Sequence, residues 1–308
     1  MTSRDQTFRS FTPEQAAQYA SGRGGAYPTP IYQTIMDYHQ GKRSLCLDVG
    51  TGPGKAVWDL LAYFERCIGC DTSAQMIEQA KKDAAERGVG DKTSFVVCGG
   101  EDCVDALSET ERGTVDLVTC AMAAHWMDLP AFYVAVSKAL RPGGTLAVWT
   151  CSSYYCHPSV PNYKAIQAVL EDLEDNILGP YMTPGNRMSR SGYDTLTLPW
   201  SIPGMKGMFV ESAFQRADWD RYGIPSSPSL PDGSPGPFLC GERVTRQKAE
   251  AGLSSSSAVI RWREANPEKA HTDEDAIKII GRRLQEIMGE NDRLIVGPSC
   301  TLLMMRKA

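Results

Sequence analysis

The chain has 308 residues, of which 42% are hydrophobic and 22% charged, and its formal net charge is −5. A chain of this length can bury a substantial core in one large domain or two small ones. The sequence has neither a basic patch nor an apolar run near the ~20 residues of a membrane-spanning helix, so we expect no nucleic-acid partner and no membrane partner.

The ten cysteines are expected to be reduced core residues of a cytoplasmic protein. The first residues lack the apolar core of a signal sequence, and Cys46, Cys98 and Cys120 fall inside predicted buried strands. Cys67 and Cys70 have the Cys-x-x-Cys spacing of a redox or metal pair. On a strand, an offset of three places the two side chains on opposite faces, so we expect no metal site there.

The segment ahead of the sheet is predicted to contain helices at 13–20 and 31–38, joined by a loop rich in glycine and proline. This loop holds Arg23 between glycines and is flanked by Tyr19 and Tyr27. The composition is that of an adaptable lid over a polar ligand, although many such loops are only connectors.

The stretch Ser44–Gly54 reads S-L-C-L-D-V-G-T-G-P-G. Its short apolar run, bounded by glycines, indicates a buried parallel strand. The glycines mark a turn where the backbone approaches another group closely. Residues 55–64 follow with apolar side chains at helical spacing. Strand, glycine turn and helix together form the nucleotide-binding unit of doubly wound folds.

The spacing of the glycines distinguishes between nucleotides. Gly50, Gly52 and Gly54 give Gly-x-Gly-x-Gly, and Lys55 stands where a dinucleotide fingerprint has its third glycine. No Ser or Thr follows Lys55, so a phosphate loop is also disfavoured. Asp48 lies two positions before the first glycine, where its carboxylate would repel a pyrophosphate but suit an ammonium group. The alternative is a glycine turn that only packs the strand on the helix.

Acidic residues end the next two predicted strands. Asp71 lies 17 residues after Gly54, and its two carboxylate oxygens match two adjacent ribose hydroxyls. Thr72 follows at the start of a helix that contains Met76. After the third strand, Glu101 and Asp102 could accept a proton from an adenine amino group; the alternative is a solvated turn.

A fourth strand is predicted at 115–119, followed by Ala121–Trp126, a helix at 131–140, a tight turn at 141–144 and a fifth strand at 145–150. Strands that alternate with helices in this way predict a parallel sheet with right-handed crossovers. Ligands of such sheets bind at the carboxyl ends of the strands. All the candidate ligand-binding stretches fall at those ends.

The pattern weakens from Cys151 onward, and these later segments are expected to roof the pocket and select the substrate. The predicted parts are helices at 162–177, 254–263 and 274–288, an irregular stretch at 178–207, a surface loop at 225–241, and strands at 208–219 and 299–306. The predicted organisation is a lid segment at 1–41, a cofactor-binding core at 42–150, and the last strands with inserted lid segments at 151–308.

With these motifs in order, the chain resembles the class I S-adenosylmethionine (SAM) methyltransferases over nearly its full length. The matching motifs are D-V-G-T-G-P-G, C-D-T-S, G-G-E-D, V-D-L-V-T-C-A-M-A-A-H-W-M-D and L-R-P-G-G-T-L. The resemblance implies an α/β, Rossmann-like, doubly wound and mostly parallel seven-stranded sheet with helical lid insertions. It also implies SAM as cofactor and S-adenosylhomocysteine as product. The implied cofactor-binding residues are Asp48, Gly50, Gly52, Gly54, Asp71, Thr72, Met76, Glu101, Asp102, Ala121 and Trp126.

Shorter motifs narrow the resemblance to the trans-aconitate methyltransferase-like group common in fungi. They are the pair His125-Trp126, the Y-x-x-G-R and Y-P start, and the terminal T-L-L-M-M-R-K. Members of this group methyl-esterify small carboxylic acids, and the group also contains natural-product methyltransferases with other acceptors. The first loop reads G-R-G-G-A-Y-P, which departs from the usual Arg-Pro-x-Tyr-Pro and leaves the family role of Arg23 open.

The acceptor determines which side chains are needed. A carboxylate, with a pKa near ~4, is already ionised and needs only cationic or hydrogen-bonding partners such as arginine. A phenol, with a pKa near ~10, needs a base, for which His125 is the candidate. His125 could instead hydrogen-bond the backbone or the cofactor. Catalytic candidates are His125 and Arg23, and substrate-binding candidates are Tyr19, Arg23, Tyr27, His125, Trp126, Trp149, Arg187 and Arg190.

The predicted function is SAM-dependent O-methylation of a small carboxylic acid in secondary metabolism, by a monomer or homodimer whose partner is a small-molecule acceptor. The alternatives are an O-methyltransferase acting on a phenol or hydroxyl of a natural product, and a protein of this fold that binds SAM without methyl transfer. A nicotinamide-dependent oxidoreductase is a further alternative, disfavoured by Lys55.

Overall fold

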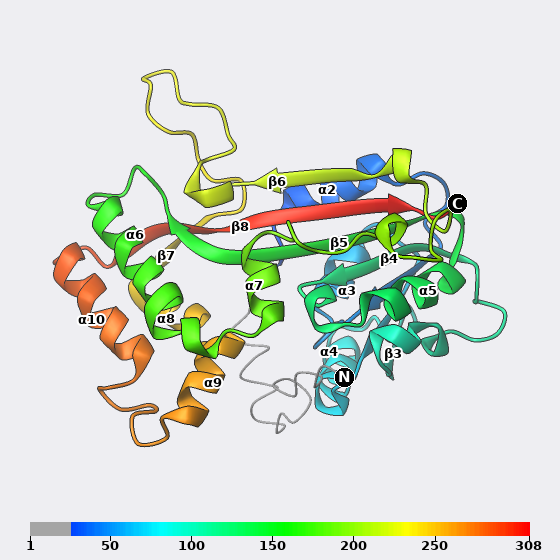
Figure 1. Cartoon of the computed structure of the whole chain (residues 1–308), viewed down its shortest axis with the longest axis horizontal. Helices are drawn as coiled ribbons and strands as arrows, with labels where there is room; N and C mark the ends of the chain where they lie inside the picture. Colours follow the sequence, from blue (N-terminus) through cyan, green and yellow to red (C-terminus); the bar gives the residue numbers. More distant parts are fainter. Residues whose placement is uncertain (1–25) are drawn as a thin grey trace.

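The computed structural model describes residues 26–308, in which eight strands form one sheet (Figure 1). Seven of them lie in the order β3-β2-β1-β4-β5-β8-β6, and the short strand β7 pairs with β8. The strands are β1 (Leu45–Val49), β2 (Arg66–Asp71), β3 (Thr93–Val97), β4 (Val115–Ala121), β5 (Leu140–Cys156), β6 (Gln215–Trp219), β7 (Glu242–Thr245) and β8 (Arg293–Arg306).

The first five strands are parallel to one another, and β8 runs antiparallel to β5, β6 and β7. The predicted doubly wound and mostly parallel arrangement is therefore confirmed over the seven-stranded path. The strand β7 is an addition to that prediction. All five residues of β1 are buried, as expected of a central parallel strand covered on both faces.

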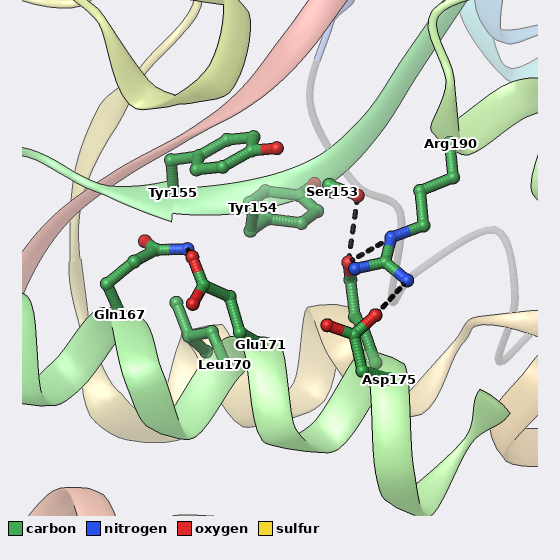
Figure 2. A pocket seen from close by; sticks show the side chains of 9 residues that line it. Ser153, Tyr154, Tyr155, Gln167, Leu170, Glu171, Asp175 and Arg190 are labelled. Carbon is green, nitrogen blue, oxygen red and sulfur yellow. Dashed lines mark hydrogen bonds and ion pairs between the residues drawn. The ribbon is translucent and has the colours of Figure 1, made fainter.

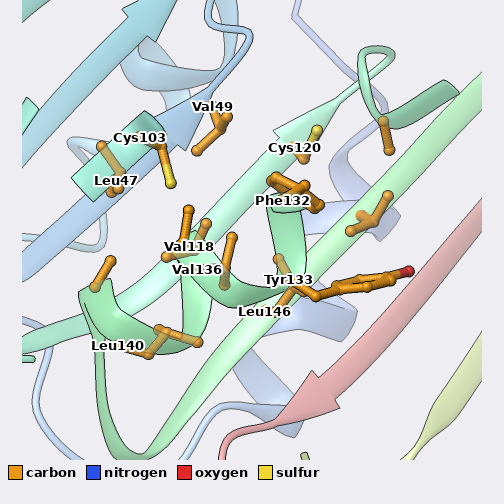
Figure 3. Close-up of a cluster of buried hydrophobic side chains, with 14 of the residues drawn as sticks. Leu47, Val49, Cys103, Val118, Cys120, Phe132, Tyr133, Val136, Leu140 and Leu146 are labelled. Carbon is orange, nitrogen blue, oxygen red and sulfur yellow. The ribbon is translucent and has the colours of Figure 1, made fainter. Parts of the chain in front are cut away.

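Helices cover both faces of the parallel half of the sheet. On one face, α3 packs over β1 and β2, α4 packs over β2 and β3, and α2 lies over β5 and β8. On the other, Phe132 and Val136 of α5 lie against Leu47, Val118 and Leu146 of three neighbouring strands (Figure 3). The helices concerned are α2 (Thr29–Tyr38), α3 (Lys55–Leu60), α4 (Ala74–Arg87) and α5 (Leu129–Ala139), with the 3₁₀ turns η1 (Gly100–Ala106) and η2 (Ala124–Trp126).

The two cysteines of the Cys-x-x-Cys motif lie on opposite faces of β2, as predicted. Cys67 belongs to the cluster under α2, α3 and α4, whereas Cys70 belongs to the cluster under α5. All ten cysteines of the chain are free thiols, and eight of them are buried.

A third apolar cluster forms beyond the parallel strands. The strands β5 and β8 continue as a long antiparallel pair, and helices gather around its far end (Figure 1). The predicted division at residue 150 therefore falls inside β5. The helices in this part are α6 (Tyr163–Asp172), extended by the π turn η3 (Leu173–Ile177), and α7 (Pro184–Arg190), α8 (Arg246–Ser254), α9 (Ser257–Ala265) and α10 (Ala276–Met288).

Several predicted boundaries in the second half are wrong. The turn expected at 141–144 is part of β5, and the register between β4 and β5 shifts beside it. The strand expected at 208–219 forms only as β6, because a 3₁₀ turn, η6 (Glu211–Ala213), precedes it. The helix expected at 254–263 forms as α9 and begins three residues later, because the hydroxyl of Ser256 caps it by accepting from Val259 N.

The stretch 178–207 was expected to be irregular, but it contains α7. Thr183 and Asn186 form a capping box at its start, and Pro184 occupies the first turn, where proline is tolerated. A Pro-Gly pair is a common turn signal, but proline also fits the first turn of a helix. Among residues 26–308, the helices are all too short or too polar to cross a membrane.

Candidate cofactor and acceptor site

The glycine turn after β1 is fastened to the end of β2. Gly50 N and Thr51 N both donate to the carbonyl oxygen of Cys70, at 2.8 and 3.0 Å. Gly50, Gly52 and Gly54 have φ values of +70°, +55° and +85°, a conformation that favours glycine. A Cβ on Gly50 would lie 2.4 Å from Cβ of Ala123, whereas one on Gly52 would have no atom within 4 Å. Gly52 therefore borders open space, as a backbone cradle for a ligand requires.

Asp48 is a buried carboxylate beside this turn. Its Oδ1 accepts a 2.6 Å hydrogen bond from Thr119, and its Oδ2 has no hydrogen-bond partner within residues 26–308. Burial raises the pKa of Asp48 to about 6; the hydroxyls of Thr119 and Thr51 oppose this shift, and the negative charge of Asp71 adds to it. A buried oxygen of this kind is costly unless a cation or donor meets it. The ammonium group of the cofactor that the sequence resemblance implies would be such a partner.

Asp71 is held in place by two backbone groups at the end of β2. Its Oδ2 accepts from Gly52 N and its Oδ1 from Ser73 N, both at 2.9 Å. Each carboxylate oxygen has a second lone pair, so the fixed carboxylate suits the two hydroxyls of a ribose. Ser73 also caps α4 by accepting from the nitrogen of Met76, which is buried, while Thr72 is exposed.

The predicted adenine-side acids begin η1, after β3. Oε1 of Glu101 accepts from Asp128 N at 3.0 Å and thereby links η1 to the start of α5. Asp102 is exposed and has a non-helical backbone conformation. Glu101 therefore lies at the edge of the sheet that carries Asp48 and Asp71. One of its two carboxylate oxygens is already engaged by Asp128 N.

The chain bends sharply where β4 ends. After the buried Ala121, Met122 has a φ of +55°, which is rare for a residue other than glycine. Its backbone nitrogen donates to Trp149 O at 2.9 Å, and its sulfur accepts from Cys151 N. This bend directs the chain into η2, which carries His125 and Trp126. Strained backbone of this kind is concentrated at functional sites.

His125 and Trp126 are half-buried and lie together, with ring centroids 4.5 Å apart. The Nδ1 atom of His125 is 2.9 Å from the hydroxyl of Tyr193, a residue that the sequence analysis missed. Tyr193 is 68 positions further along the chain. No local motif marks such a contact; its only signal in the sequence is a tyrosine next to a glycine.

The helix α7 packs directly on this turn. A Cβ on Gly185 would lie 2.7 Å from His125 O and 2.8 Å from the ring of Trp126, so the two backbones meet closely. At the other end of α7, the hydroxyl of Ser189 is 2.6 Å from that of Thr150 in β5. The helix therefore bridges η2 and β5.

Two other predicted substrate residues meet on the opposite side of the sheet. The ring of Trp149 is buried under those of Tyr27 and Tyr32, with centroids 5.4 and 6.0 Å away in edge-to-face geometry. The Lys55 ammonium lies 4.4 Å from the Tyr27 ring centroid. Nε1 of Trp149 is buried with no partner in the described part of the chain. These aromatic side chains thus approach the start of α3, beside the glycine turn.

The predicted arginines lie farther along the lid. Arg187 is exposed and donates to Gly179 O at 3.2 Å. Arg190 pairs with Glu174 at 3.0 Å and with Asp175 at 2.5 Å, at the edge of a cavity of about 170 Å³ between β5 and α6 (Figure 2). The charge of Arg190 is therefore already compensated by two carboxylates. Tyr19, Arg23 and the helix predicted at 13–20 lie outside the described residues.

The chain between residues 26 and 308 places no group of three or more His, Cys, Asp or Glu side chains where they could hold a metal ion. The site instead consists of the glycine turn, the fixed carboxylates of Asp48 and Asp71, and the pair His125 and Trp126. A doubly wound sheet with these features at its strand ends defines a nucleotide-derived cofactor site.

The comparisons support a class I SAM-dependent methyltransferase. Residues 47–148 match the family described as a methyltransferase domain. CRG1 of Saccharomyces cerevisiae, classed as an S-adenosylmethionine-dependent methyltransferase, is 27% identical over 89% of this chain and 88% of its own length. The tRNA 5-carboxymethoxyuridine methyltransferase of Escherichia coli K12 is 31% identical over 44% of this chain and 51% of its own length.

Among solved structures, one assigned to a type II methyltransferase from Anaeromyxobacter dehalogenans has a TM-score of 0.60 and 23% sequence identity. The likeness covers 91% of this chain and 95% of that protein, and it shows the shared fold. The protein is therefore a SAM-dependent methyltransferase, with SAM as cofactor.

Proposed function

We propose that the enzyme transfers a methyl group to a carboxylate oxygen of a small acid and so forms a methyl ester. The observation that carries this proposal is the 2.9 Å contact between His125 Nδ1 and the buried hydroxyl of Tyr193. The contact uses one ring nitrogen to hold the imidazole in place at the end of β4. A side chain fixed in this way suits the positioning of an acceptor that is already ionised.

The chemistry of a carboxylate acceptor fits such a site. SAM supplies an activated methyl group on a positively charged sulfur. A carboxylate, with an ordinary pKa near ~4, has no proton to lose at neutral pH. The protein therefore needs to align the acceptor and exclude water, which are the tasks of positioning residues and a closing lid.

Each group of residues then has a proposed task. Asp48, Asp71 and the glycine turn hold the cofactor. His125 and Trp126 place the acceptor beside it, and α7 supports them from behind through Gly185. One relative adds support, because the 5-carboxymethoxyuridine in its name carries a carboxyl group. We also propose that the chain belongs to the trans-aconitate methyltransferase-like group and acts in secondary metabolism in the cytoplasm.

The test is to incubate the enzyme with SAM labelled in its methyl group and a panel of mono- and dicarboxylic acids and phenols. Methyl esters release their label as methanol in mild base, whereas methyl ethers do not. We expect base-labile label from a carboxylic acid. Base-stable label from a phenol, with none from the acids, would show that the acceptor is a hydroxyl. Boiled enzyme, and enzyme inhibited with S-adenosylhomocysteine, serve as controls.

A further inference from the structure

Tyr193 is held rigidly where it meets His125. Its side chain is 2% exposed and its backbone φ is +60°. The preceding residue, Gly192, accepts a 3.0 Å hydrogen bond from Arg216 of β6, and a Cβ on it would lie 2.8 Å from the hydroxyl of Thr301 in β8. The end of the α7 segment is thus fixed to the antiparallel part of the sheet, so the phenol has little freedom to turn away.

The proton of the Tyr193 hydroxyl is retained at neutral pH. Burial raises the pKa of Tyr193 well above its ordinary range, while the Thr150 hydroxyl beside the phenol oxygen acts in the opposite direction. Thr150 is itself 2.6 Å from the hydroxyl of Ser189. A buried hydroxyl must place its proton on an acceptor, and a neutral imidazole has one acceptor nitrogen.

We propose that Tyr193 is a positioning residue that donates its proton to Nδ1 of His125 and so fixes the neutral imidazole with its own proton on Nε2. In this tautomer Nε2 is a hydrogen-bond donor, and its lone pair is not available to remove a proton. The end of β4 then presents a donor that suits a carboxylate oxygen of the acceptor. This inference rests on the proposed ester-forming function for its purpose, but the tautomer itself is a property of the protein.

The tautomer can be measured without any acceptor. In protein labelled with ¹⁵N-histidine and saturated with S-adenosylhomocysteine, the two ring nitrogens of His125 give distinct shifts when the proton is fixed on one of them. The chain has four histidines, and the His125 signals are those lost in His125→Asn. At pH 8 we expect a protonated Nε2 and an unprotonated Nδ1 in the wild type.

Tyr193→Phe removes the hydroxyl and keeps the ring. We expect the His125 signals to move toward the averaged shifts of a mixture of tautomers, and kcat/KM for the best carboxylic acid to fall about 3–10-fold, the size of one lost hydrogen bond. The matched control is Tyr133→Phe, which removes another buried hydroxyl, bonded to Thr197 O at 2.9 Å. The control should leave the His125 signals and the rate unchanged.

A wild-type protein with its proton on Nδ1 would overturn the inference, as would unchanged His125 signals in folded Tyr193→Phe. The wild-type spectrum alone decides if that variant does not fold. Failure of the proposed function is a separate result: base-stable methylated product from a phenol would refute ester formation, whatever the tautomer of His125.

Discussion

Asp48 and Thr119 face each other across β1 and β4, and the Thr119 hydroxyl donates to the Asp48 carboxylate at 2.6 Å. This contact fixes one carboxylate oxygen inside the sheet. The other oxygen is buried beside the glycine turn without a hydrogen-bond partner among the described residues. Strand β1 thus places the negative charge of Asp48 where the positively charged amino group of SAM is expected.

The affinity for SAM should therefore depend on the ionisation of Asp48. Its pKa is raised to about 6 in the cofactor-free protein, so the carboxyl is protonated below that pH and cannot pair with an ammonium. We expect the affinity to fall by up to about tenfold per pH unit below 6. Asp48→Asn should weaken binding at pH 7.5 by about 1.5–3 kcal/mol and abolish this pH dependence.

Isothermal titration calorimetry between pH 5 and 8 measures both effects. The control is Asp105→Asn, which removes an exposed carboxylate whose partner is Arg112. A wild-type affinity that is constant across this range would show that Asp48 does not hold the ammonium.

The stability of the cofactor-free protein should change with pH in the opposite direction to the SAM affinity: it should rise as the pH falls. The unfolded chain has an aspartate pKa near ~3.9, below the folded value of about 6. Between these two values the folded state binds more protons, so the contribution of Asp48 to stability falls as the pH rises from about 4 to about 6. At pH 7, Asp48→Asn should be more stable than the wild type by up to about 3 kcal/mol.

Urea denaturation at pH 4.5 and pH 7, without cofactor, tests this expectation. The gain in Asp48→Asn should shrink at the lower pH, because the wild-type carboxyl is protonated there. An equal gain at both pH values would contradict the raised pKa.

Asp71→Ala should weaken SAM binding by roughly 1–3 kcal/mol through the loss of charge-assisted hydrogen bonds. It should also loosen the glycine turn, since Asp71 accepts from Gly52 N. Asp71→Asn retains an acceptor oxygen and should lose less. Calorimetry on both variants separates the loss of the negative charge from the loss of the acceptor oxygens. Unchanged affinity in Asp71→Ala would refute the assignment of Asp71 to the ribose.

Gly52→Val should abolish cofactor binding while the protein stays folded. A side chain there has open space in the cofactor-free protein, so it would enter the volume reserved for the ligand. The positive φ of +55° adds a backbone cost of about 1–2 kcal/mol. Gly88→Val is a control of similar strain, because Gly88 has a φ of +67° and equally open surroundings at the end of α4.

Both variants should lose similar stability in a thermal melt, but only Gly52→Val should lose SAM. Normal SAM affinity in folded Gly52→Val would mean that the turn is not the cradle.

The parallel half of the fold could be predicted from the sequence because its signals are local. An apolar run, a glycine turn and a capped helix lie within a few residues of one another, as at Asp48–Gly54 and Asp71–Met76. The repeats also fix which edge of the sheet carries the ligand-binding residues. The second half lacks such signals, since β5 and β8 are paired across about 150 residues.

The acceptor side depends on contacts that no local pattern reveals. Tyr193 reaches His125 because α7 packs on η2, and α7 begins with Pro-Gly, a pair more typical of turns. The pairing of Arg190 with two carboxylates likewise requires α6 and η3 to be placed beside α7. The sequence shows that an arginine is present, but only the fold determines which charged side chains surround it.

The most direct test of ester formation is the pH–rate profile of the wild type and His125→Ala on the best acceptor. A carboxylate stays ionised from about pH 6 to 8, so we expect a flat kcat in this range and a substantial kcat in the variant. A general base would instead cost ~10²–10⁴ in rate when removed. A steep rise of the wild-type rate near neutral pH, lost in His125→Ala, would contradict the account and indicate a hydroxyl acceptor.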